Sequence, residues 1–136
     1  MPSCVFGLCM TSVREFIIVY GGYDDQQSRN CNELWIYNTL RDSWRLHKAP
    51  AEKENCCVDS AICTFGNSVY IFGGCSISHP VRATNSIITF DIINETWQNI
   101  SPHIDNTCLN TPPPMFRSCI FYHNGSLYVV GGGHLS

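Results

Sequence analysis

The sequence predicts an all-β fold assembled from a repeated unit, and three observations carry that prediction. Three apolar segments, 16–20, 68–72 and 126–130, each run into a pair of glycines. After the first two pairs comes a further apolar segment, and a tryptophan follows its last aromatic residue after seven positions in both cases. Aromatic residues make up 12% of the 136 residues, and aromatic side chains favour strands.

The repeat is marked by the same residue types in the same order. The glycine pairs are Gly21-Gly22, Gly73-Gly74 and Gly131-Gly132, the aromatic residues are Tyr37 and Phe90, and the tryptophans are Trp44 and Trp97. A glycine pair permits a tight exit from a strand, with backbone angles that other residues resist. Large aromatic side chains supply apolar area for packing between units. We therefore expect all these residues to have structural roles.

Each unit is expected to contain four strands. These are 3–8, 15–22, 33–38 and 43–47 in the first unit, 59–65, 68–74, 85–91 and 96–100 in the second, and 117–123 and 126–132 in the third, which has two. The first strand is placed at 3–8 because Ser3-Cys4-Val5-Phe6 echoes Ser118-Cys119-Ile120-Phe121. Gly66-Asn67 and Asn124-Gly125 are typical of two-residue turns between strands. The units span approximately residues 3–47, 59–100 and 117–136.

A repeat of roughly 50 residues with a glycine pair, an aromatic residue and a tryptophan at a fixed offset resembles the kelch repeat. The resemblance covers nearly the whole chain and implies a β-propeller, in which four-stranded sheets called blades surround an axis. The implied fold is a kelch-type β-propeller fragment, with two four-stranded antiparallel blades plus the first two strands of a third. Because propellers have about four to eight blades, we expect a fragment of a longer protein. Its strand edges should invite the remaining blades or self-association.

Composition narrows the range of partners. Eight Lys plus Arg against eleven Asp plus Glu give a net charge of −3, so the sequence predicts no nucleic-acid partner. The longest apolar run, 16–20, is far shorter than a membrane span, so we expect no membrane partner. We also expect no signal peptide at the start of the sequence.

The nine cysteines bear on location and on metal binding. Their odd number, without C-x-x-C spacing, favours reduced structural thiols in a cytoplasmic protein. Sequons at Asn94, Asn99 and Asn124 keep a secreted protein as the alternative. Cys75 and His79 share one loop and His103 lies near Cys108, but neither pair supplies the ligands of a closed zinc site. We expect no metal and no cofactor.

Candidate partner-binding residues lie in the loops that the kelch resemblance gathers at one end of a propeller. These loops follow the second strand of a unit, at 23–32 and 75–84, or the fourth, at 48–58 and 101–116. The candidates are Tyr23, Asp24, Asp25 and Arg29 in the first loop, His79 and Arg82 in the next, and Arg117 at the start of the third unit. Tyr and Arg are enriched among binding anchors, and Arg pairs bidentately with carboxylates.

The resemblance implies a protein-interaction module that binds a protein or peptide through these loops. Within the kelch family this includes the substrate-recognition part of a cullin ubiquitin ligase, which is an inference from family membership. No G-x-S-x-G, H-E-x-x-H or P-loop pattern occurs in the sequence, so we do not expect an enzyme. The alternative is part of a secreted kelch-type propeller enzyme or of an extracellular receptor.

Overall fold

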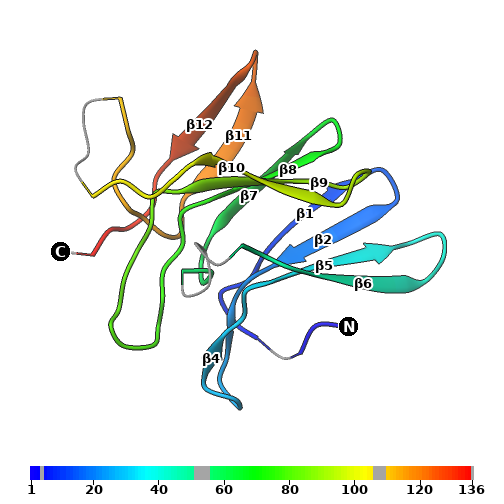
Figure 1. Ribbon diagram of the computed structural model, residues 1–136, viewed down its shortest axis with the longest axis horizontal. Coiled ribbons are helices and arrows are strands. Elements are labelled where there is room, and N and C mark those ends of the chain that lie inside the picture. The colour runs from blue at the N-terminus through cyan, green and yellow to red at the C-terminus, as the bar shows by residue number, and fades with distance from the viewer. Residues whose placement is uncertain (4, 51–55, 106–109, 136) are drawn as a thin grey trace.

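The computed structural model describes residues 1–3, 5–50, 56–105 and 110–135, and these residues form strands, turns and bridges without a helix (Figure 1). The strands are β1 (Cys9–Val13), β2 (Phe16–Tyr20), β3 (Tyr23–Asp24), β4 (Arg29–Asn30), β5 (Glu33–Asn38), β6 (Ser43–Lys48), β7 (Ala61–Phe65), β8 (Ser68–Phe72), β9 (Ile87–Asp91), β10 (Thr96–Ser101), β11 (Cys119–His123) and β12 (Ser126–Val130). The all-β prediction is therefore confirmed. None of the described segments is a helix that could span a membrane.

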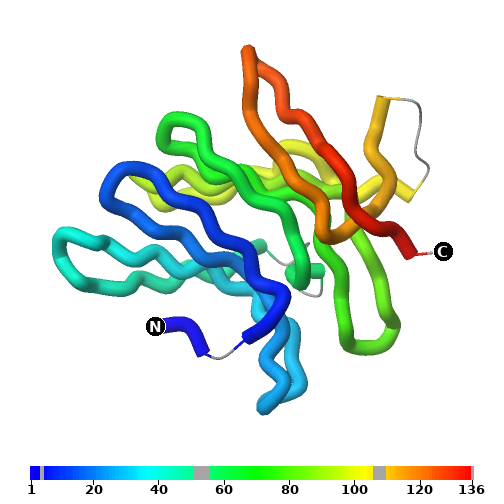
Figure 2. The backbone as a smooth tube through the Cα atoms, turned by 180° about the vertical axis from the view of Figure 1, so that it is seen from behind, coloured from blue at the N-terminus to red at the C-terminus, as the bar shows by residue number. Residues whose placement is uncertain are grey.

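Two antiparallel sheets of four strands form the body of the molecule. Blade 1 has the strand order β1-β2-β5-β6, and blade 2 contains β7, β8, β9 and β10 in chain order across the sheet. The third unit is the hairpin β11–β12, and a small hairpin, β3–β4, extends from blade 1. The three units lie side by side, with their hairpin turns at one end and their longer connections at the other (Figure 2).

The first strand of blade 1 corrects the sequence prediction. It runs over Cys9–Val13 and not over 3–8, because Arg14 takes a positive φ of 51° and forms the tight turn to β2. The earlier segment serves as a lead-in, in which Phe6 forms an antiparallel bridge with Tyr23. Val58 bridges Cys75 and Phe116 bridges Gly133 in the same way, so the three units begin alike.

The main hydrophobic core lies between the two blades. Its buried residues are Ile18, Tyr20, Leu34 and Ile36 from blade 1, Val69, Ile71, Ile88 and Phe90 from blade 2, and Cys57 from the connection. Trp97 packs against this core, with its ring centroid 4.9 Å from that of Phe90. Alternate residues along each strand point into the interface, as the period-2 geometry of strands requires.

A second, smaller core joins blade 2 to the third unit. Ala61, Phe72 and Ile120 are its buried members. Tyr122 of β11 stacks on Phe65 of β7 with ring centroids 4.0 Å apart. The hairpin β11–β12 therefore sits on blade 2 by the face that carries Ile120 and Tyr122, and its other face is exposed.

The glycine pairs let consecutive units approach through their backbones. A Cβ atom on Gly73, where φ is +66°, would lie 2.5 Å from the carbonyl oxygen of Met115. Gly21 meets the carbonyl oxygen of Cys57 even more closely. No side chain fits in these places, and the left-handed backbone is itself one that glycine adopts readily. The glycines thus belong to the junctions between units as much as to the strand exits.

Six of the seven described cysteines are buried or half-buried. Burial raises the pKa of Cys63, and it is the main cause of the raised pKa of Cys31 and of Cys75. Cys119 is the exposed case, on the outer side of β11. A raised pKa lowers the thiolate fraction at neutral pH, so buried thiols act here as small apolar side chains. Cys4 and Cys108 lie outside the described residues.

Candidate functional site

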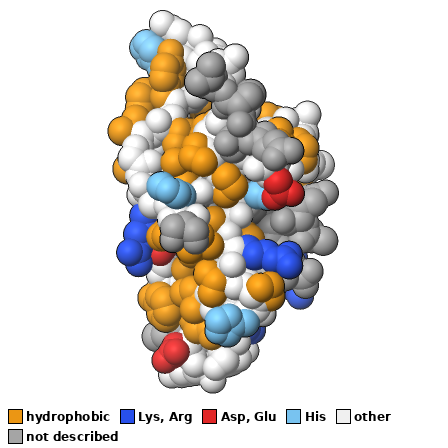
Figure 3. Space-filling model, turned by 90° about the vertical axis from the view of Figure 1, so that its left-hand side faces the viewer, with side chains coloured by type: hydrophobic (Ala, Val, Ile, Leu, Met, Phe, Trp, Pro, Cys, Tyr) orange, Lys and Arg blue, Asp and Glu red, His pale blue; other side chains and the backbone are white. Residues whose placement is uncertain are grey.

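The candidate site lies at the end of the molecule where the longer connections meet, which we call the loop face. It comprises residues 21–32, 49–50, 56–60, 73–86, 102–105, 110–118 and 131–135. Figure 3 looks onto this end of the molecule, where Lys, Arg and His side chains lie around a band of hydrophobic ones. Connections from all three units contribute, so the loop face exists only in the folded chain.

The first group of predicted residues lies on the hairpin β3–β4, and two of them hold that hairpin together. Asp24 is 2% exposed, and its Oδ1 accepts the backbone N–H groups of Gln26 at 3.0 Å and Gln27 at 3.1 Å. The ring of Tyr23 packs on that of Phe6, with centroids 5.5 Å apart. Oδ1 of Asp24 therefore stabilises the turn by accepting these hydrogen bonds, and the ring of Tyr23 holds Phe6 of the lead-in segment in place.

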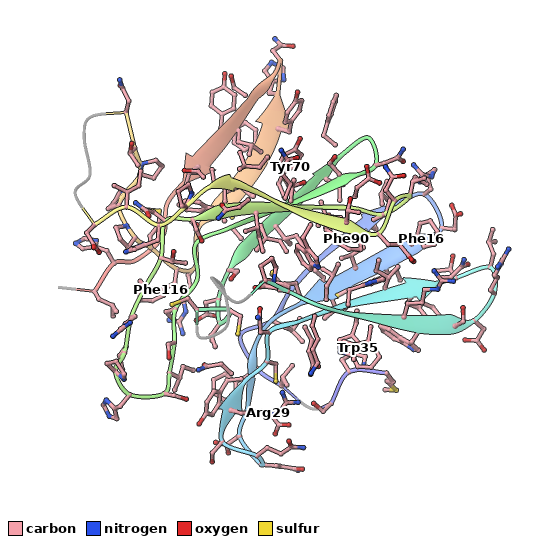
Figure 4. All side chains as sticks on the ribbon, viewed as in Figure 1. Phe16, Arg29, Trp35, Tyr70, Phe90 and Phe116 are labelled. Carbon is pink, nitrogen blue, oxygen red and sulfur yellow. The ribbon has the colours of Figure 1, made fainter. Side chains whose placement is uncertain are left out.

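The other two residues of this group are exposed. Asp25 sits at the tip of the hairpin. Arg29 donates from Nε to Gln27 at 3.1 Å, and its Nη1 lies 3.5 Å from the carboxylate of Glu33. Arg29 projects from β4 at one extremity of the molecule, away from Phe116 (Figure 4). Gln27 and Glu33 orient the guanidinium of Arg29, and its other N–H donors face solvent.

The second group, His79 and Arg82, shares one small hollow. Ser76, Ser78, His79, Pro80 and Arg82 line about 280 Å³ of open space there. Asn30 of β4 holds this loop against the first hairpin, because its Nδ2 donates to the hydroxyls of Ser76 and Ser78 at 3.3 Å each. The structure thus links the two predicted loops through a residue that the sequence reasoning did not select.

Arg117 stands at the start of the third unit. Its Nε donates to Oδ2 of Asp59 at 2.9 Å, and its side chain remains 73% exposed. The guanidinium also lies over the ring of Phe116, 5.9 Å from the centroid. An exposed ion pair of this kind contributes little stability. Asp59 and Phe116 therefore orient the guanidinium of Arg117, while most of its side chain stays accessible to a partner.

An open depression of about 700 Å³ lies on the loop face. Its lining comes from four connections: Cys56, Arg82, Ala83, Thr84, His103, Asp105, Pro113, Pro114, His134 and Leu135. Arg82 lines both this depression and the smaller hollow. His103 is held between Thr84, whose Oγ1 lies 3.2 Å from Nδ1, and Asp105, whose Oδ1 lies 2.9 Å from Nε2. The depression thus offers apolar proline surface beside ionisable side chains.

Two asparagines that the sequence reasoning missed position these connections. Asn85 is 3% exposed and donates from Nδ2 to the carbonyls of Ile104 and Pro112 at 3.1 Å. Asn32 holds the same place in the first unit and donates to the carbonyls of Ala49 and Pro50 at 3.3 Å. The available signal was an Asn five residues before the aromatic residue of the repeat, Tyr37 or Phe90, in both full units. His103 and His134 also escaped selection as partner-binding residues.

The loop face offers hydrogen-bond donors and apolar surface to solvent. In the described part of the chain, no group of three or more His, Cys, Asp and Glu side chains is placed to hold a metal ion. Asp24 and Asp59 are engaged in a turn and in an ion pair. The exposed donors of Arg82 and Arg117 can pair with carboxylates, and the prolines can pack on apolar side chains.

Comparison with known proteins places the chain in a family. Residues 2–136 match the KLHDC2/KLHL20/DRC7 Kelch-repeats domain. The dynein alpha chain of the flagellar outer arm from Chlamydomonas reinhardtii is 27% identical over a match of 128 residues, and the match covers 88% of this chain and 3% of that one. The solved structure of YjhT superimposes with a TM-score of 0.67 at 16% identity, over 94% of this chain and 34% of that one.

The match to the family extends over nearly all of the described residues, and the structural likeness confirms the kelch-type propeller fold. The chain spans only a small part of the dynein chain and about a third of YjhT, so their whole activities do not transfer to it. The two four-stranded sheets and the third hairpin are successive blade positions of such a propeller. By its repeats, its sheets and this match, the chain belongs to the KLHDC2/KLHL20/DRC7 Kelch-repeats domain family.

Proposed function

We propose that the chain is a non-catalytic interaction module that binds a protein or peptide partner through its loop face. The supporting observation is the depression of about 700 Å³, which connections from all three units form together. A rigid sheet scaffold that presents irregular connections suits recognition, because the scaffold fixes the loops while their sequences vary. Family membership supports an interaction role in general.

The partner contacts of this proposal come from Arg82 and Arg117, with His79, His103 and His134 around them. Arg82 borders both hollows and has an exposed side chain. Arg117 is held by Asp59 at 2.9 Å with most of its side chain in solvent. Tyr23, Asp25 and Arg29 form the outer rim on the first hairpin, while Asp24 supports that rim from within.

A displayed library of random peptides tests the proposal with a defined probe. Peptides enriched on the wild-type chain should lose at least tenfold in affinity for Arg82→Glu and several-fold for Arg117→Ala. Arg41→Glu is the matched control, because Arg41 is exposed on the β5–β6 turn at the opposite end. Arg117→Ala should leave the fold intact, since an exposed ion pair contributes about 0–1 kcal/mol. Enriched peptides that bind Arg82→Glu as well as wild type would contradict the proposal.

The narrower form of the proposal is substrate recognition for a cullin ubiquitin ligase, in the cytoplasm. Its support is the kelch family membership alone. Recovery of a cullin with the full-length protein from cells, unaffected by Arg82→Glu, would support it. Titration of free thiols on the endogenous protein tests the location, because reduced cysteines throughout are expected in the cytoplasm.

A further inference from the structure

The connection between β8 and β9 projects from the loop face (Figure 1) and forms a hollow within itself. Its lining residues are Ser76, Ser78, His79, Pro80 and Arg82, and we call it the serine hollow. All five residues belong to this one loop of the second unit, so the path of the loop itself shapes the hollow. Its volume of about 280 Å³ lies just below the range of about 300–1,000 Å³ that is common for sites of whole small molecules. The serine hollow therefore suits a single chemical group.

Hydrogen bonds hold the loop around the serine hollow in one shape. The N–H of Ser76 donates to the carbonyl of Arg82 at 2.8 Å, and the hydroxyl of Ser76 donates to the carbonyl of Ser78 at 2.9 Å. Asn30 of β4 braces the loop from the first unit. Its Oδ1 accepts the N–H of Ile77, and its Nδ2 donates to the hydroxyls of Ser76 and Ser78, all at 3.3 Å. The hollow is thus organised before a ligand arrives, which lowers the entropic cost of binding.

The side chains around the serine hollow carry donors that the fold does not use. The hydroxyl of Ser78 accepts from Asn30, and its own hydrogen has no acceptor among the described residues. His79 is exposed, and an imidazole carries at least one N–H group. Arg82 is exposed as well, with five N–H donors on its guanidinium. A hydroxyl, an imidazole and a guanidinium therefore border the same small space.

The charge around the serine hollow favours an anion. Residues 75–84 contain no Asp or Glu. Arg29 and Arg117, two other arginines of the loop face, are each oriented by an acid, Glu33 and Asp59. Arg82 forms no ion pair with any residue in the described part of the chain. An anion bound there would pair with a guanidinium that no carboxylate of the fold already engages.

We propose that the serine hollow binds the phosphoryl group of a phosphorylated serine or threonine on the partner peptide. This inference rests on the proposed function and names the chemistry of the partner. A phosphoryl group has three strong acceptor oxygens and a charge of about −1.5 to −2 at pH 7, which matches donors that come from separate side chains. A carboxylate has two oxygens in one plane, which a single guanidinium satisfies. Arg82 pairs with the charge, and Ser78 and His79 donate to the remaining oxygens.

Arg82 also connects the serine hollow with a place for the rest of the peptide. It lines both this hollow and the depression of about 700 Å³, where Pro113 and Pro114 offer apolar surface. A peptide whose phosphorylated residue enters the hollow can therefore lay neighbouring residues in the depression. Nucleic acids carry phosphoryl groups too, but a net charge of −3 does not provide the basic surface that a polyanion requires. The observations thus favour a phosphopeptide.

Two synthetic peptide libraries test the inference on the full-length protein. One has a central phosphoserine between degenerate flanks, and the other has serine at the same position. The affinity measured by fluorescence polarisation should be about tenfold higher for the phosphorylated library, because hydrogen bonds to a charged group are the strong ones. Equal affinities for the two libraries would overturn this inference and leave the proposed function standing. Binding of neither library would overturn both.

Competitors identify the source of the phosphoryl group. Unlabelled phosphopeptide should displace the labelled phosphorylated library at a much lower concentration than inorganic phosphate or a single-stranded RNA, because only the peptide also contacts the depression. Displacement by inorganic phosphate at the same concentration would show that the peptide chain adds nothing, and it would overturn the assignment to a phosphopeptide. Displacement by the RNA at a lower concentration would overturn it as well.

Variants of the hollow separate the phosphoryl contact from the rest of the loop face. Ser78→Ala should reduce the preference for the phosphorylated library several-fold while the affinity for the unphosphorylated one stays unchanged. Arg82→Gln should abolish the preference. Ser43→Ala and Arg41→Gln are the matched controls, because both residues are exposed near the β5–β6 turn at the opposite end. Thermal unfolding checks that each variant folds. A preference that survives either variant of the hollow in a folded chain would overturn the inference.

Hydrogen exchange read by mass spectrometry locates the bound group. Relative to the unphosphorylated library, the phosphorylated one should slow amide exchange within residues 75–84. Asn30→Ala should weaken this protection, since it removes the brace on Ile77 and on both serines. Extra protection confined to residues 23–32 or 110–118 would place the phosphoryl group elsewhere and overturn the site.

Discussion

The backbone carbonyl of Met115 lies 2.5 Å from the position that a Cβ atom on Gly73 would take. The two residues belong to different units, and the neighbouring Gly74 donates its N–H to the same carbonyl at 2.9 Å. This contact repeats the one between Gly21 and Cys57. The glycine pair therefore sets how closely two units approach, and it does so through the backbone without any side-chain chemistry.

Gly73→Ala should destabilise the chain much more than Gly66→Ala. Both residues have a positive φ, but a Cβ atom on Gly66 meets nothing within 4 Å. Left-handed strain costs about 1–2 kcal/mol in either variant, and displacing a packed backbone adds about 1–3 kcal/mol for Gly73. Urea denaturation followed by tryptophan fluorescence measures the difference. Equal losses would show that the junction can yield.

Trp97→Ala should cost more stability than Trp44→Ala, although the two tryptophans hold the same place in their units. Trp97 packs on the core between the blades, beside the buried Phe90. Trp44 packs on Tyr37 and is not among the residues of that core. Removal of a fully buried aromatic side chain costs about 3–5 kcal/mol, and the partly buried Trp97 should cost about the lower end of that range. The comparison is best made by thermal unfolding at low protein concentration, and a larger loss for Trp44→Ala would contradict it.

Asn85→Ala should lower both stability and partner affinity. The substitution removes two donated hydrogen bonds and leaves the N–H of Ile104, now bonded to Asn85 Oδ1 at 2.9 Å, without its acceptor. Buried polar groups left unpaired cost about 1–3 kcal/mol each. Asn99→Ala, on the exposed side of β10, is the control and should stay within about 0.5 kcal/mol of wild type. An unchanged affinity for enriched peptides in Asn85→Ala would show that this residue does not position the depression.

Asp91 should stabilise blade 2 at neutral pH, and this stabilisation should be lost in acid. Its Oδ1 accepts the N–H groups of Asn94 at 2.9 Å and Ile93 at 2.8 Å, and these bonds lower the pKa of the carboxyl below its ordinary 3.8. Because the folded-state pKa is lowered, the stabilisation is present above pH 3.8 and is lost as pH falls through the folded value.

Asp91→Asn is the variant that tests this pH dependence. Asn38 makes the equivalent turn in blade 1, where its Oδ1 accepts the N–H groups of Leu40 at 3.0 Å and Arg41 at 3.1 Å. An asparagine therefore preserves the bonds without titrating. Melting temperatures measured from pH 7 to pH 2.5 should fall less steeply for Asp91→Asn than for wild type. Parallel curves would exclude a contribution from Asp91.

Much of the fold could be predicted because strand alternation and turn residues are local signals. The predicted strands of the second unit match β7 to β10 closely, and Gly66-Asn67 forms the expected turn. The first strand was misplaced by about six residues, because the turn at Arg14 adopts a positive φ without a glycine to signal it. The lead-in role of Phe6 is visible only in its bridge to Tyr23.

The candidate site depended far more on tertiary contacts. The loops themselves could be located from the repeat, and Arg82 and Arg117 do lie at the loop face with exposed side chains. Asp24 looked equally available in the sequence, yet its carboxylate accepts hydrogen bonds from backbone N–H groups of its own turn and therefore points inward. Asn85 looked unremarkable, although it bonds residues 19 and 27 positions away.

The repeat, the all-β class and the kelch family could all be predicted, because glycine pairs, aromatic residues and strand alternation are patterns that extend over only a few residues. Long-range contacts determine which polar side chains bond within the fold and which connections form the depression. Those outcomes depend on backbone groups that meet across units more than 30 residues apart, such as Gly22 and Cys57. A local pattern specifies each partner in such a contact, but only the packed chain brings the two together.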